Sequence, residues 1–378
     1  VEVFGRTWLT AIAAIIVMYA LLRVIALLVT ERGRLRLAAT IARIWRWEFW
    51  PAWLFYIPTA IYIAYLSIRH GGFNVITAAN PAIPLGGFVG ESKCEILRQL
   101  DATFVVPFAR VTSAGELYPL MNDRGWRFPI ILKPDVGERG ASVRRISNLA
   151  QAEQYLAGHP GPTLVQPFHP GPHEAGIFYY RLPGAARGEI FSITDKILSE
   201  LIGDGTSTFE ELIWRHSRYR MQATVFLKRH AEHKDRILQN GERFLLAMAG
   251  NHCQGTMFRD GIHLVTPKLA ARIDQIARSF EGFFIGRFDV RYSDVAQFMA
   301  GKDLAIVELN GVTAESSNIY DPRASLLAAY RTMFRQWRIL FAIAKTNIAR
   351  GHCPAGHCEM LRALFRHYIN RRPDPLAD

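Results

Sequence analysis

Two long apolar stretches lie near the start of the chain, and shorter apolar runs follow them. Residues 8–29 are interrupted only by Thr10 and Arg23, and residues 49–68 are rich in Trp and Tyr. Each stretch has about 20 residues, roughly the length with which an α-helix crosses a bilayer. Tryptophans, which favour the membrane–water interface, mark the entry of the second stretch: Trp45, Trp47, Trp50 and Trp53. We therefore expect residues 1–70 to form membrane-associated helices; the alternative is a pair of buried helices in a soluble core.

The link between the two stretches is basic, and this creates a conflict of topology. Residues 30–50 carry five arginines against Glu31 and Glu48. Basic links stay in the cytosol, so a second crossing would place the rest of the chain on the opposite side. Three arrangements remain: the second stretch re-enters with Pro58 as the break, both stretches lie in the interface on anionic lipid, or the link departs from the rule. We expect the rest of the chain on the cytoplasmic side of an inner or plasma membrane.

After residue 70 the pattern changes to short alternating runs. Residues 71–91 are rich in Gly, Pro and Asn and predict a linker loop. Beyond them, short apolar runs predict strands at residues 128–133, 163–168, 188–196, 283–292 and 304–309. Helical periodicity predicts helices at residues 149–157, 268–280 and 322–348. This mixture indicates an α+β fold.

Composition adds information on partners. The net charge of +12 points to anionic partners: a membrane, nucleic acid or phosphorylated molecules. No zinc-finger, helix-turn-helix or RNA-binding signature is present, so we expect no nucleic acid. Four cysteines are too few for a disulfide framework and favour a reducing compartment. Near the C-terminus two His-Cys pairs leave open a zinc site or a plain tail: His352, Cys353, His357 and Cys358.

The first candidate for chemistry is a lysine followed by a glycine-rich loop. Lys133 ends a predicted strand, and Gly137, Gly140 and Ser142 follow it. Such a loop presents backbone N–H groups to phosphate oxygens, and the lysine adds a positive charge. The order of lysine before glycines excludes a Walker A motif. The pattern indicates phosphate binding, with an ordinary strand-to-turn connection as the alternative.

The second candidate is a set of oxygen ligands on two predicted strands. Asp289 lies within the predicted strand at residues 283–292, while Glu308 and Asn310 end the run at residues 304–310. Glu308 and Asn310 are two residues apart on an extended chain and share a face. Two carboxylates and an amide suit Mg²⁺ ions that also contact phosphates. The alternative is a pair of charged strand ends exposed to solvent.

The order of lysine, glycine-rich loop, Asp and Glu-x-Asn resembles the ATP-grasp superfamily. The sequence is most similar in character to D-alanine–D-alanine ligases and to the ligase part of cyanophycin synthetases. Residues 287–289 (RFD) resemble the Arg-x-Asp strand of the family, and residues 202–213 (IGDGTSTFEELI) resemble an element of the cyanophycin-synthetase-like enzymes. The resemblance implies two α+β lobes that clasp ATP, at residues 92–163 and 164–345, with a C-terminal tail at residues 346–378.

The resemblance also implies a role for each matching residue. Lys93, Lys133 and Lys196 would hold the phosphates of ATP, and residues 135–142 would close over them. The hinge with Gln166 and Phe168 would receive adenine, although the family usually has Glu at the position of Gln166. The remaining implied roles are ribose binding by Glu174, binding of two Mg²⁺ ions by Asp289, Glu308 and Asn310, and catalysis by Arg287 and Lys196.

The activity implied is an ATP-dependent carboxylate–amine or carboxylate–thiol ligase that works through an acyl phosphate. Most members have an α/β domain ahead of the ATP lobes, whereas this chain has apolar helices there. That departure favours a lipid-linked or membrane-proximal substrate. Two alternatives stay open: an ATP-grasp kinase that phosphorylates a hydroxyl or carboxylate, and a membrane-tethered nucleotide-binding protein without turnover.

Overall fold

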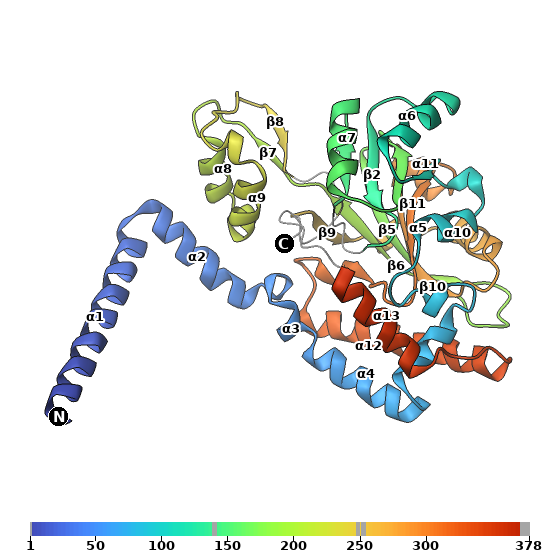
Figure 1. The fold of residues 1–378 in the computed structure, drawn as a ribbon, viewed down its shortest axis with the longest axis horizontal. Coiled ribbons are helices and arrows are strands. Elements are labelled where there is room, and N and C mark those ends of the chain that lie inside the picture. Colours follow the sequence, from blue (N-terminus) through green and yellow to red (C-terminus); the bar gives the residue numbers. More distant parts are fainter. Residues whose placement is uncertain (1, 138–141, 247–249, 251–254, 371–378) are drawn as a thin grey trace. The chain divides into compact units, whose positions relative to one another are not determined.

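The computed structural model describes residues 2–137, 142–246, 250 and 255–370 (Figure 1). Its contacts divide the chain into two units, Val1–Ala52 with Glu200–Leu246, and Trp53–Ser199 with Ala247–Asp378. We call them the N-terminal unit and the main unit. The second apolar stretch therefore falls mostly in the main unit, whereas the first belongs to the N-terminal unit.

The main unit contains two antiparallel sheets (Figure 1). The four-stranded sheet has the order β1-β4-β2-β3, and the five-stranded sheet has the order β11-β10-β5-β6-β9. The strands of the first are β1 (Ala109–Val111), β2 (Ile130–Pro134), β3 (Arg144–Ile146) and β4 (Thr163–Pro167). Those of the second are β5 (His173–Tyr180), β6 (Glu189–Ile197), β9 (Met257–Asp260), β10 (Ile285–Tyr292) and β11 (Ala305–Asn310). The predicted strands and the α+β class are confirmed.

Helices of the main unit cover these sheets. They are α4 (Ile57–His70), α5 (Lys93–Arg98), α6 (Ala114–Asp123), α7 (Leu149–Gly158), α10 (Pro267–Ser279), α11 (Val295–Met299), α12 (Leu326–Ala349) and α13 (His357–Asn370). The short helix α3 (Ala52–Phe55) precedes them in sequence and follows a 3-10 helix. Apolar residues of α6 and α7 pack on the four-stranded sheet, with Leu117, Ile130 and Leu156 at the centre.

The alternation of side chains along β5 and β10 separates the core from a polar face. Ile177 and Phe288 point into a core that also contains Ile273 of α10. On the opposite face Phe178 packs with α4 and α12. Because neighbours along a strand point to opposite sides, Arg287 and Asp289 share the face that Phe288 does not. One face of the sheet thus packs with α10, and the other face carries apolar residues against α4 and α12 together with polar residues such as Asp289.

The second apolar stretch is partly a core element. Leu66 of α4 is buried with Leu340 and Phe341 of α12. Tyr62 of α4 contacts Phe334 of α12, with ring centroids 4.5 Å apart. The expected alternative of a buried helix therefore describes this inner face of α4. Among the described residues, no helix combines the length and apolar character needed to cross a membrane.

The N-terminal unit joins two segments that are distant in sequence. It contains α1 (Glu2–Val29), α2 (Glu31–Trp45), β7 (Glu200–Ile202), α8 (Phe209–Arg215), α9 (Ala223–Arg229) and β8 (Arg243–Leu245). Thr208 and Glu211 form a reciprocal capping box at the start of α8, which explains the helix after the IGDGTST segment. The buried Glu48 carboxylate pairs with Arg218 at 3.4 Å, and Arg32 pairs with Glu210. Ion pairs therefore connect residues 31–49 to residues 200–246.

Asn80 fixes residues 73–91 against β10. Its side chain is fully buried, donates to the carbonyls of Gly86 and Ile285, and accepts from the N–H groups of Phe284 and Ile285. We expect Asn80→Ala to lower the free energy of unfolding by about 3 kcal/mol or more, because buried backbone groups lose their partners. Urea unfolding measures this. The exposed Asn122→Ala serves as control, and a similar loss in both variants would contradict the prediction.

Candidate active site

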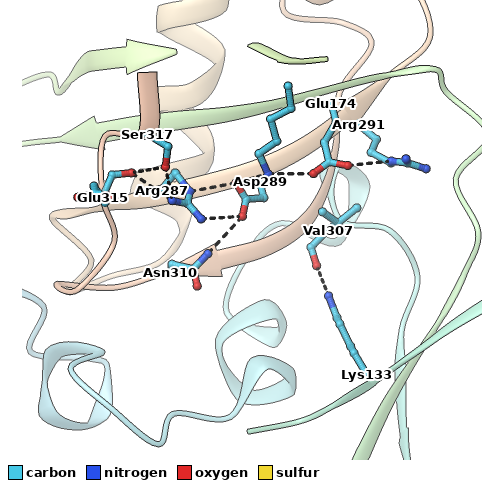
Figure 2. A network of polar contacts seen from close by, with 10 residues as sticks. Lys133, Glu174, Arg287, Asp289, Arg291, Val307, Asn310, Glu315 and Ser317 are labelled. Carbon is cyan, nitrogen blue, oxygen red and sulfur yellow. Dashed lines mark hydrogen bonds and ion pairs between the residues drawn. The ribbon is translucent and has the colours of Figure 1, made fainter. Parts of the chain in front are cut away.

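Asp289 lies at the centre of a buried polar cluster on β10 (Figure 2). Its carboxylate receives Arg287 Nε on Oδ1 at 3.0 Å and Arg287 Nη2 on Oδ2 at 3.1 Å, a bidentate contact. Lys196 Nζ of β6 lies 3.1 Å from Oδ1. Burial alone raises the pKa of Asp289, but Arg287 and Lys196 outweigh it and lower the pKa to about 2. The site therefore holds Asp289 as a carboxylate.

Lys196 connects this cluster to Glu174 on β5. Lys196 Nζ donates to Glu174 Oε1 at 2.9 Å, and Glu174 Oε2 lies 3.5 Å from Arg291 Nε. Burial lowers the pKa of Lys196, but Asp289 and Glu174 oppose this and the net pKa is raised. Lys196 is thus a fixed positive charge in the site. The structure brings together the expected phosphate lysine and the expected ribose acid, here as partners of each other.

Glu308 and Asn310 lie beside Asp289 on β11. Antiparallel pairing places Glu308 directly opposite Asp289 and Asn310 opposite Arg287, so the side chains of each pair are roughly 5 Å apart at Cβ. Asn310 Nδ2 also lies 3.4 Å from Asp289 Oδ2. The three predicted metal ligands therefore share one patch. Two carboxylates and an amide suit Mg²⁺ bound jointly with phosphates, and a cation would also balance the second carboxylate.

Lys133 approaches the same patch from the other sheet (Figure 2). It lies on β2, is only 5% exposed, and donates to the Val307 carbonyl of β11 at 2.9 Å. Burial lowers the pKa of Lys133, and the charge of Glu308 opposes that effect. The lysine predicted from the strand-and-loop pattern thus lies next to the predicted metal ligands, although 174 residues separate it from Val307.

The loop after Lys133 is only partly described. Lys93 Nζ, at the start of α5, donates to the Gly137 carbonyl at 2.6 Å. Ser142 has a left-handed backbone with φ 58°, and its hydroxyl contacts His159 Nε2 at 3.0 Å. Gly140 lies outside the described residues. Lys93 therefore contacts the start of this loop, and its expected contact with the phosphates of ATP stays a prediction.

Arginines surround the predicted adenine hinge. The guanidinium of Arg145 lies 4.5 Å from the ring centroid of Phe168, and that of Arg291 lies 5.2 Å from it. Gln166 Nε2 lies 3.5 Å from the Val307 carbonyl, the acceptor of Lys133. The sequence pattern did not identify Arg145. The signal available was the Arg144-Arg145 pair within a short strand.

The loop after β11 holds Arg287. Arg287 Nη1 donates to the Glu315 carbonyl at 3.1 Å and to the Ser317 hydroxyl at 3.0 Å (Figure 2). The Tyr56 hydroxyl donates to Glu315 Oε1 at 2.6 Å. The sequence pattern did not identify these contacts. They orient Arg287 toward the Asp289 carboxylate.

The His-Cys pairs near the C-terminus do not form a metal site. Among the described residues, no group of three or more His, Cys, Asp or Glu side chains lies close enough to bind one ion. Cys353 and Cys358 are both exposed free thiols. The described residues therefore give no support to the zinc alternative, and helix α13 begins at His357.

The charge state of Asp289 predicts a dependence of stability on pH. Its pKa is lowered to about 2 in the folded chain, against about 3.9 in an unfolded chain. The contribution of the Asp289 charge to the free energy of unfolding is therefore complete above about pH 4 and is lost as the pH falls toward 2. In Asp289→Asn we expect the free energy of unfolding to fall less steeply as the pH decreases, by up to about 1.4 kcal/mol per pH unit. Urea unfolding between pH 5 and 2 tests this. The same slope of the free energy of unfolding against pH in the original protein and in Asp289→Asn would contradict it.

Comparison with known proteins gives weak similarities only. No protein-family profile and no curated protein sequence matches the chain. Among solved structures it is similar to a bifunctional glutathione synthetase from Pasteurella multocida, at 14% identity and a TM-score of 0.34, over 64% of this chain and 35% of that one. A D-alanine–D-alanine ligase from Bacillus anthracis gives 12% identity and a TM-score of 0.38, over 68% and 67%. A biotin carboxylase from Campylobacter jejuni gives 11% identity and a TM-score of 0.39, over 69% and 48%.

Proposed function

We propose that this chain is an ATP-dependent ligase of the ATP-grasp type that activates a carboxylate and joins it to an amine or a thiol. The observation that carries the proposal is the convergence on β11. Lys133 reaches it from the four-stranded sheet, while Asp289, Glu308 and Asn310 share one patch of the five-stranded sheet. Phosphoryl transfer depends on positioning and charge neutralisation, and this patch offers buried lysines beside metal-binding oxygens.

The proposed roles follow from charge and position. Lys133 and Lys196 hold phosphates, with Lys93 at the start of the glycine-rich loop. Asp289, Glu308 and Asn310 would hold two Mg²⁺ ions, which supply charge neutralisation for the phosphates when bound. Because Lys196 already contacts Asp289, a bound Mg²⁺ ion would share the Asp289 carboxylate with this lysine. Gln166 and Phe168 receive adenine, and Glu174 receives the ribose hydroxyls once ATP competes for its contact with Lys196.

The proposed reaction has two steps. An oxygen of the substrate carboxylate attacks the γ-phosphorus, the bond to the β-phosphate oxygen breaks, and ADP leaves. An amine or thiol then attacks the acyl carbon, inorganic phosphate leaves, and the nucleophile loses its proton to solvent. Arg287, held by Asp289, Glu315 and Ser317, stabilises the oxyanion that develops in the second step.

Hydroxylamine trapping tests this proposal. The protein is incubated with Mg-ATP, hydroxylamine and a panel of carboxylic acids that includes amino acids, hydroxy acids and lipid extracts. We expect a hydroxamate with at least one acid, together with ADP and phosphate. A stable phosphate ester without hydroxamate would instead identify a kinase. If no ATP is consumed under any condition, the result would support a nucleotide-binding protein without turnover.

We also propose that the N-terminal unit attaches the protein to a membrane, with the catalytic part on the cytoplasmic side where ATP is available. Described side chains of α1 are exposed and apolar, including Trp8, Ile16 and Val29. Arg34 and Arg36 follow on α2, which suits contact with anionic headgroups. A membrane-proximal carboxylate substrate would match this location. These features support attachment and leave the depth of insertion open to experiment.

Liposome sedimentation tests the attachment. We expect the protein to bind vesicles that contain about 30% phosphatidylglycerol more strongly than pure phosphatidylcholine vesicles, with a loss of about tenfold when Ile15, Ile16 and Leu22 are replaced by Ser. The exposed Leu361→Ser in α13 is the control variant. Equal binding of all variants to both vesicles, or binding to neither, would contradict the proposal.

A further inference from the structure

A cavity lies beside the β9 edge of the five-stranded sheet. It has a volume of about 290 Å³ and is lined by the end of β9, by residues 318–324 and by the first turns of α12. Small-molecule pockets usually have roughly 300–1,000 Å³, so this cavity suits a short segment of a ligand. Its polar wall contains Asp260, Asn318, Asp321 and Arg323, and its apolar wall contains Ala328 and Ala329.

Asp321 is a structural member of this wall. Its carboxylate accepts from the Asp260 N–H at 2.9 Å, the Arg323 N–H at 2.9 Å and Arg323 Nη2 at 2.7 Å, with Arg259 Nη1 at 3.3 Å. Burial raises the pKa of Asp321, but Arg323 and these backbone contacts lower it overall. The negative charge of Asp321 is therefore already balanced within the protein.

Asp260 differs in its contacts. Its Oδ1 accepts from the Ile262 N–H at 3.3 Å and from Asn318 Nδ2 at 3.2 Å. Its Oδ2 receives no hydrogen bond from any residue in the described ranges. Arg323, which lines the same cavity, feels the charge of Asp260, but its ion pair within the described residues is with Asp321. One carboxylate oxygen in the wall of the cavity thus remains for a ligand.

The cavity and the candidate active site share one face of the sheet. Asp260 pairs with Thr194, Thr194 with Gly176, and Gly176 with Asp289, so all four lie in one row. Three inter-strand steps place Asp260 roughly 14 Å from Asp289. The Thr194 hydroxyl between them is buried and has no hydrogen-bond partner among the described residues. The row therefore offers one further polar group, the Thr194 hydroxyl, between the two positions.

We propose that this cavity binds a primary ammonium group at the remote end of the substrate, through Asp260. The methylene chain next to that ammonium would contact Ala328 and Ala329. The other end of the molecule would reach Arg287 and Asp289, so the substrate would be elongated and cationic at one end. The placement of the reacting end of the substrate at Arg287 and Asp289 rests on the proposed ligase function. Binding of the ammonium group at Asp260 does not.

Ligand-observed NMR with the full chain tests the site. The probes are n-butylammonium, n-butanol and butyrate, which share a carbon chain and differ in charge. We expect n-butylammonium to bind most tightly and to lose about tenfold or more in affinity in Asp260→Asn, because Asn keeps the Oδ1 contacts and removes only the charge. n-Butanol should bind equally to both proteins. Tighter binding of butyrate, no binding of n-butylammonium, or equal affinity in Asp260→Asn would overturn the proposal.

Two further variants complete the test. Ala328→Leu fills the cavity and should abolish n-butylammonium binding with Asp260 intact, so the test stands if Asp260→Asn fails to fold. Glu281→Gln removes one negative charge from an exposed position and should change nothing. If n-butylammonium binds as expected but no hydroxamate forms with any acid, only the ligase proposal is contradicted. If hydroxamate forms but neither Ala328→Leu nor Asp260→Asn changes n-butylammonium binding, only this inference is contradicted.

Discussion

Glu308→Gln is expected to lower ATP-dependent turnover by about 100- to 1,000-fold, since the variant removes one of two carboxylates that would hold Mg²⁺ against the phosphates. Glu308 is half-buried and lies opposite Asp289, and its charge opposes the lowering of the pKa of Lys133 by burial. Its replacement should change the free energy of unfolding by less than about 1 kcal/mol. Coupled ADP detection and urea unfolding provide the two measurements.

The same pair of measurements separates catalysis from folding. Glu281→Gln, at an exposed position, is the matched control and should keep full turnover. Excess Mg²⁺ should partly restore the activity of Glu308→Gln, because the variant weakens metal binding and leaves Lys133 and Arg287 in place. Full turnover of Glu308→Gln would remove the metal role of Glu308 and with it the main support for the proposed chemistry.

Asp289→Asn is expected to have the largest effect on stability. The variant leaves the buried Lys196 with Glu174 as its partner, and it leaves the half-buried Arg287 with the charges of Glu308 and Glu315. Unpairing a buried ion pair from one side costs about 3–5 kcal/mol, because the remaining charge loses its compensation. Urea unfolding at pH 7 measures this loss, and turnover should disappear as well.

A double-mutant cycle tests the cause. Lys196→Met together with Asp289→Asn should lose less stability than the sum of the two single variants, by about 1–3 kcal/mol, since the double variant removes both charges of the contact. An additive result, or a loss below about 1 kcal/mol in Asp289→Asn, would mean that the cluster is not a coupled ion network.

Strand periodicity made part of the site predictable from the sequence. Residues 287–292 of β10 alternate between polar and apolar, and the spacing of two residues places Glu308 and Asn310 of β11 on one face. The pairing of Asp289 with Glu308 then follows from antiparallel register. Lys133 was predicted because it ends an apolar strand, although its contact with Val307 depends on how two sheets meet.

Long-range polar contacts left no such signal. Asn80 lies in a loop without periodicity, yet it makes four buried hydrogen bonds with residues 86, 284 and 285. Tyr56 contacts Glu315 across 259 residues. The packing of α4 on α12 was equally hidden, because an apolar helix gives the same pattern whether it faces lipid or a protein core. Residue type alone cannot distinguish these cases.

The separation of Glu48 and Arg218 also affects how the chain is made. The two side chains that pair inside the N-terminal unit are 170 residues apart. At a synthesis rate of about 5–20 residues per second, the ribosome needs roughly 9–34 s to reach Arg218 after it has added Glu48. During that interval α1 and α2 exist without their partner segment. Whatever binds them on the nascent chain, a chaperone or a lipid surface, therefore competes with completion of this unit.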